Sequence, residues 1–81
     1  MIISDKIRAL LKMSNVKSKD YAAALNLSNS AALNTKYVRG SFKIQDLIVL
    51  ANVTGTKLAF LDEQNKPLII FEKEDIEDDK D

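Results

Sequence analysis

The sequence predicts a mainly helical domain of four short helices, followed by a C-terminal β-hairpin and a disordered acidic tail. Three observations lead to this fold class. Apolar residues recur at helical spacing over residues 1–55, short aliphatic and aromatic runs replace that pattern over residues 56–72, and charged residues fill residues 73–81. Because a chain of 81 residues supports one hydrophobic core, these stretches are expected to be parts of one domain.

The first two helices are expected over residues 4–13 and 18–25. In the first segment apolar side chains recur at helical spacing, and Ser4 or Asp5 stands where it can cap the start. In the second, Ser18 can cap a run rich in alanine, whose small side chains let another helix approach closely. A polar break separates these two helices.

The boundaries of the next helices are set by residues that tolerate a left-handed backbone. Asn26 is expected to end the second helix in that conformation, because asparagine tolerates it better than most residues do. The third helix is then capped from within residues 28–30 and ends at Gly40. The fourth helix begins at Ile44 and ends at Gly55.

Beyond the fourth helix, two short apolar runs predict a β-hairpin. They span residues 56–61 and 68–72 and are joined by a polar turn; the alternative is that one run continues as helix or coil. Both faces of the ribbon carry large apolar side chains, yet the helices of one chain can cover only one face. We therefore expect the hairpin to be a dimerisation element. The residues expected at that contact are Leu58, Phe60, Leu61, Ile69 and Phe71.

Missing residue types exclude several classes of function. The chain has no cysteine and no histidine, which excludes disulfides, zinc fingers, haem ligation and histidine catalysis. The remaining nucleophiles form no evident activating pair, so we expect neither an enzyme nor a metal or other cofactor. Apolar runs stay well short of the ~20 residues that a membrane span needs, so a cytoplasmic protein without membrane contact is expected.

Charge is distributed unevenly along the chain. Residues 1–60 carry nine basic and three acidic side chains, a net charge of +6, whereas residues 61–81 carry three basic and nine acidic ones, a net charge of −6. Aspartate and glutamate are absent between Asp20 and Asp46. A basic body of this kind indicates a nucleic-acid partner, although a solvated surface with a solubilising tail explains the charges alone equally well. Residues 73–81 hold too little apolar surface to offset the entropy of folding, so they are expected to be disordered.

Two short helices joined by a tight turn have the spacing of a helix-turn-helix. In that motif the second helix lies in the major groove and presents side chains to base edges. Here Leu33 and Tyr37 would face the core, so the opposite side of the third helix is polar. The side chains expected to contact bases are Asn29, Ser30, Ala31, Asn34 and Thr35. Those expected to contact phosphates are Lys17, Ser18, Lys19, Lys36, Arg39 and Lys43.

Four segments carry a resemblance to a known family. They are VKSKDYA (residues 16–22), LNLS (25–28), ALNTKY (32–37) and RGSF (39–42). With these segments the chain resembles the Cro and phage-repressor helix-turn-helix family, also called the XRE type, over about residues 4–61. The resemblance implies a repressor-like fold, contacts to DNA from the second and third helices, and binding as a dimer. The chain departs from the family in two places: Asn26 replaces the usual glycine of the turn, and lysines replace the usual glutamine near the start of the second helix.

Two functional hypotheses follow from these patterns. The first is a sequence-specific transcriptional regulator, of the repressor kind, that binds double-stranded DNA at a pseudo-palindromic operator as a homodimer, with no small-molecule substrate. The second is a protein-interaction module, or an antitoxin-like partner, that uses the hairpin and carries a degenerate helix-turn-helix. A DNA mobility shift at low salt favours the first hypothesis, whereas co-purification of another polypeptide favours the second.

Overall fold

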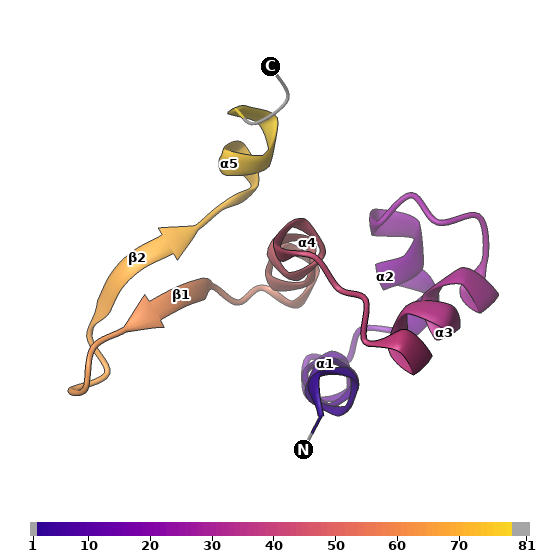
Figure 1. Cartoon of the computed structure of the whole chain (residues 1–81), viewed down its shortest axis with the longest axis horizontal. Helices are drawn as coiled ribbons and strands as arrows, with labels where there is room; N and C mark the ends of the chain where they lie inside the picture. The colour runs from indigo at the N-terminus through magenta and orange to yellow at the C-terminus, as the bar shows by residue number, and fades with distance from the viewer. Residues whose placement is uncertain (1, 79–81) are drawn as a thin grey trace.

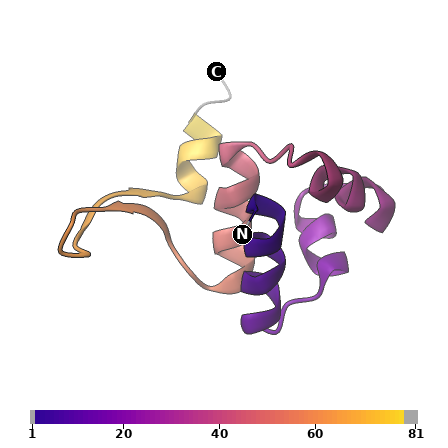
Figure 2. The same cartoon turned by 60° about the horizontal axis from the view of Figure 1, so that its bottom comes forward.

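The computed structural model describes residues 2–78 of the chain, which are mainly helical and include a two-stranded antiparallel hairpin (Figure 1). The elements are α1 (Ile3–Met13), α2 (Ser18–Ala24), α3 (Ser30–Arg39), α4 (Ile44–Thr54), β1 (Leu58–Leu61), β2 (Pro67–Phe71) and α5 (Lys73–Asp78). Helices α1 and α4 lie in the middle, with α2 and α3 on one side and the hairpin projecting on the other (Figures 1 and 2). Each helix within residues 2–78 is too short or too polar to span a lipid bilayer.

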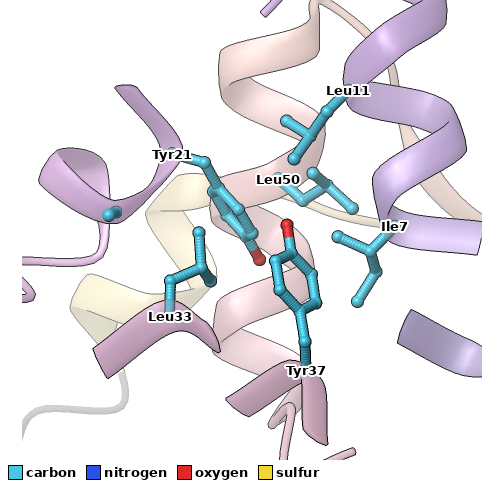
Figure 3. Packing of buried hydrophobic residues seen from close by; sticks show 7 residues of the cluster. Ile7, Leu11, Tyr21, Leu33, Tyr37 and Leu50 are labelled. Atoms are coloured by element: carbon cyan, nitrogen blue, oxygen red, sulfur yellow. The ribbon is translucent and has the colours of Figure 1, made fainter. Parts of the chain in front are cut away.

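The core lies where the first four helices meet (Figure 3). Its buried members are Ile7, Leu11, Tyr21, Ala22, Leu33, Tyr37 and Leu50. The hydroxyl of Tyr21 donates to the backbone carbonyl of Asp46 at 2.7 Å. The hydroxyl of Tyr37 is also buried, but it has no hydrogen-bond partner within the described part of the chain. Burial, and secondarily the charge of Asp46 and the neighbouring Tyr37, raises the pKa of Tyr21 above its usual value.

Several helix ends lie where the sequence predicts them. Asn26, Gly40 and Gly55 have positive φ angles of 61°, 62° and 68°, which confirms three left-handed termini. Asn29 is the N-cap of α3, and its side chain accepts a hydrogen bond from the backbone N–H of Ala32 at 3.0 Å. Both ends of α3 are therefore set by local interactions.

The predicted caps of α1 and α2 were wrong. Helix α1 starts at Ile3, and Ser4 lies inside it, buried, with its hydroxyl donating to the carbonyl of Tyr37 at 2.6 Å. Helix α2 is preceded by Lys17 without a side-chain cap, and Ser18 is its first residue. Ser4 thus satisfies a carbonyl near the end of α3, where helix carbonyls lack intrahelical partners. It ties α1 to α3.

The predicted hairpin is confirmed, with a shorter first strand than expected. Leu58 lies opposite Phe71 and Phe60 opposite Ile69, and the register becomes irregular between Phe60 and Leu61. The hairpin extends away from the helices in both overall views (Figures 1 and 2). Most of its residues are therefore exposed on both faces.

The acidic tail differs from its prediction. Disorder was expected over residues 73–81, but residues 73–78 form α5, which packs against α4. A carboxylate oxygen of Asp75 accepts from the N–H of Glu72 at 2.7 Å and so caps the helix, while Ile76 is half-buried. Acidic residues in the first turn also complement the positive end of the helix dipole. Residues 79–81 lie outside the described residues.

Candidate nucleic-acid interface

The five residues predicted to contact bases all lie at the start or on the exposed side of α3. Helix α3 buries Leu33 and Tyr37, which are four residues apart, against the core. The opposite side of the helix is open to solvent. Its exposed members from the predicted set are Asn29, Ser30, Ala31, Asn34 and Thr35.

These polar side chains differ in what they can offer a base. The oxygen of the Asn29 amide accepts the capping hydrogen bond of α3, so a two-bond contact with a base would use an oxygen that is already engaged. The hydroxyl of Thr35 donates to the carbonyl of Ala31 at 3.1 Å, which leaves its oxygen as an acceptor. Asn34 lies one helical turn after Ser30, and its side chain is exposed. Asn34 is therefore the best candidate for a bidentate contact with adenine.

Most of the residues predicted to contact phosphates are exposed, and they lie at two places in the fold. Lys17, Ser18 and Lys19 surround the start of α2, and Arg39 and Lys43 follow one another across the end of α3 and the start of α4. Their side chains extend into solvent, where they can reach an anionic backbone. Cations thus precede and follow the polar side of α3 along the chain.

Lys36 does not belong to this set. Its amino group lies 3.0 Å from a carboxylate oxygen of Asp46 and 3.3 Å from the carbonyl of Ser41. The two charged side chains are 22% and 15% exposed. Lys36 therefore neutralises an internal carboxylate, and its expected contact with phosphate is replaced by an ion pair within the chain.

Two basic residues of α1 were missed by the sequence analysis. Arg8 and Lys12 lie one turn apart and, together with Lys17, line a hollow of about 360 Å³ between α1 and the start of α2. The guanidinium of Arg8 lies 4.2 Å from the centre of the Tyr37 ring and 3.6 Å from a carboxylate oxygen of Asp5. The four-residue spacing of Arg8 and Lys12 was the available signal.

The predicted dimerisation residues divide into an outer and an inner group. Phe60, Leu61 and Ile69 are exposed, with 65%, 52% and 56% of their surface accessible. Leu58 and Phe71 are half-buried, and Phe71 meets the Phe60 ring edge-on with 5.8 Å between centroids. Leu68 and Ile70, which the sequence analysis did not select, are also exposed. The apolar surface of the hairpin consists of Phe60, Leu61, Leu68, Ile69 and Ile70.

No protein-family model matches the chain, and neither a curated protein nor a solved structure matches it. What the molecule does is therefore inferred from its own residues. They provide a helix side with hydroxyls, amides and methyl groups, exposed cations before and after that helix side along the chain, and an apolar hairpin on the other side of the molecule (Figure 2).

Proposed function

We propose that the chain is a sequence-specific DNA-binding transcriptional regulator that represses from a pseudo-palindromic operator as a homodimer. In this proposal α2 and α3 are the helix-turn-helix of a repressor-like, XRE-type fold, and α3 enters the major groove. The observation that carries the proposal is the exposed side of α3. It presents Asn34 and Thr35, and no acidic residue occurs near them in the sequence. Short polar side chains let a helix approach base edges closely.

The electrostatics of the neighbouring residues support the same partner. The stretch between Asp20 and Asp46 contains no carboxylate, and the charge of Asp46 is balanced by Lys36. The cations Lys17, Lys19, Arg39 and Lys43 are exposed near both ends of the helix pair. Contacts of this kind supply affinity for any DNA sequence, so binding should weaken steeply as salt is raised.

The hairpin supports the homodimer. An isolated two-stranded sheet is marginally stable in water, and this one leaves Phe60, Leu61, Leu68, Ile69 and Ile70 exposed. Packing of the face that carries Phe60 and Ile69 against the same face of a second copy covers part of that surface and obeys two-fold symmetry. It also presents two copies of α3 to one DNA duplex, on half-sites about one helical turn apart.

Selection from random DNA tests the proposal. The purified full chain is incubated with a library of random duplexes, and bound molecules are separated, amplified and sequenced through several rounds. We expect enrichment of a two-fold symmetric motif, and a mass of the complex equal to two chains per duplex. The proposal would be contradicted if no motif is enriched and the duplexes recovered at the end bind no better than the random library.

The second candidate function is a protein-interaction module. It is favoured by the same hairpin, whose two edges are open within the described residues and can accept a strand from another protein. Under this hypothesis the chain shifts no DNA at low salt and co-purifies with a defined polypeptide. The helix pair would then have only a structural role.

A further inference from the structure

One apolar residue lies in the last turn of α3, on the exposed side of the helix. Val38 has 77% of its surface accessible. It follows Ala31 by seven residues and Asn34 by four, so the helical repeat puts these side chains on one face. Thr35, three residues before Val38, borders the same face. Val38 was not among the residues selected from the sequence.

The face of α3 that carries Val38 is mostly apolar. Ala31 and Val38 contribute only methyl groups. The hydroxyl of Thr35 donates back to the helix at 3.1 Å, and the side chain also carries a methyl group. Valine is also a weak helix former, so its exposed position on α3 does not favour folding. These methyl groups flank the amide of Asn34, which can pair with adenine.

We propose that Val38 is a specificity-determining residue that reads the C5-methyl group of a thymine in the major groove. The inference rests on the proposed function and names the kind of base step that the site takes. Thymine carries the apolar group that valine can contact in the major groove, and its partner adenine offers the two atoms that Asn34 can bind. Because Val38 lies about 6 Å along the helix from Asn34, the thymine belongs to a base pair one or two steps from that adenine.

A protein contact is the competing explanation for Val38. Ile2 and Ile3 are exposed beside it, and these residues border a hollow of about 270 Å³ at the end of α3. The methyl groups of Ala31 and Thr35, however, continue from Val38 toward the start of α3, away from the end at which that hollow lies. DNA contact accounts for the whole line of methyl groups, whereas a partner seated on the hollow accounts for one end of it.

Replacing thymine by deoxyuridine tests the proposal, because it removes only the methyl group. The duplex selected by the full chain is resynthesised with deoxyuridine at one thymine at a time, and the dissociation constant is measured for each. We expect a single position at which the change weakens wild-type binding about fourfold, as for the loss of one buried methyl group. In Val38→Ala the same change should have little effect. Met13→Ala, at another exposed apolar site of a helix, should behave as wild type.

Three outcomes would overturn the inference. The first is that wild type is indifferent to deoxyuridine at every position, and the second is that Val38→Ala loses the same factor as wild type at the sensitive position. The third is that Val38→Ala changes the mass of the protein assembly in the absence of DNA, which would assign the residue to a protein contact. Failure to select any duplex is a separate result, which removes the proposed function and this inference together. Circular dichroism of Val38→Ala checks that α3 is intact.

Discussion

The amino group of Lys36 and a carboxylate oxygen of Asp46 lie 3.0 Å apart and join α3 to the first turn of α4. The same oxygen accepts a hydrogen bond from the backbone N–H of Lys43 at 2.9 Å, and the backbone carbonyl of Asp46 accepts one from Tyr21 at 2.7 Å. Asp46 therefore connects three helices. This arrangement keeps Lys36 from acting as a free surface charge.

Lys36→Ala and Arg39→Ala should separate a structural cation from a DNA-binding one. Lys36→Ala should lower the free energy of unfolding by about 1 kcal/mol, because it leaves a partly buried carboxylate without its ion pair. It should leave the salt dependence of DNA affinity unchanged. Arg39→Ala should keep the stability and reduce the slope of log affinity against log salt by about 1. Urea unfolding and salt titrations measure the two effects; equal loss of salt dependence in both variants would contradict this assignment.

Tyr21→Phe removes a buried hydroxyl that is hydrogen-bonded, whereas Tyr37→Phe removes one that has no partner within the described residues. Tyr21→Phe should destabilise the fold by about 1 kcal/mol, because it removes the hydrogen bond to Asp46. Tyr37→Phe should leave stability unchanged or raise it by up to about 1 kcal/mol, because that hydroxyl has no partner within residues 2–78. The free energy of unfolding in urea distinguishes them. A larger loss in Tyr37→Phe than in Tyr21→Phe would reverse the assignment of the two hydroxyls.

Stability should fall in alkaline solution because of Tyr21. Its pKa is raised in the folded protein, chiefly by burial, so the unfolded chain loses the phenolic proton first, at about pH 10. The stabilisation is complete below that pH and decreases as pH rises above it, by about 1.4 kcal/mol per pH unit while only the unfolded chain is ionised. Urea unfolding from pH 8 to 11 measures the slope. Tyr21→Phe should show a shallower decline; an identical decline would place its cause in other groups.

Asn34→Ala and Lys19→Ala should affect DNA binding in different ways. Asn34→Ala should relax the preference for adenine at one position of the selected motif, with a cost of about 1–3 kcal/mol on that motif. Lys19→Ala should weaken binding to selected and random duplexes alike, because a phosphate contact carries no base information. Affinities of both variants for both duplexes provide the measurement. The division of roles fails if the two variants lose equal affinity on each duplex.

A charge on the outer surface of the hairpin should prevent dimerisation. Phe60→Asp places a carboxylate where the proposed partner hairpin packs, while the exposed position of Phe60 spares the helical core. We expect a monomer by sedimentation equilibrium and operator affinity at least ten times weaker, about 1.4 kcal/mol. Gln64→Asp adds the same charge at the exposed turn and should remain dimeric. Dimeric Phe60→Asp would exclude the hairpin as the contact.

The helix boundaries that could be predicted are those set by neighbouring residues. Asn29 caps α3 through the N–H of a residue three positions later, and Gly40 and Gly55 take backbone conformations that other residues disfavour. Each of these signals is complete within a few positions of the chain. The exposed side of α3 could be predicted for the same reason, because the spacing of Leu33 and Tyr37 determines which side is buried.

The contacts that could not be predicted join residues far apart in the chain. Ser4 bonds a carbonyl 33 positions away, so its place inside α1 depends on where α3 lies and not on its capping preference. The pairing of Lys36 with Asp46 depends in the same way on the approach of α4 to α3. Helix α5 was missed because its cap and the packing of Ile76 outweigh a composition that favours disorder.

Helix α4 lies between the helix pair and the hairpin, so it connects the proposed DNA-contacting helix to the proposed dimer contact. Helix α4 has 11 residues and is about 16 Å long; Asp46 ties its first turn to α3, and the short connection after Gly55 leads into β1. In the proposed dimer, α4 is a stiff spacer whose length and direction determine the separation and rotational phase of the two operator halves. Two chains with the same α3 but a different connection after α4 would recognise the same bases at different separations.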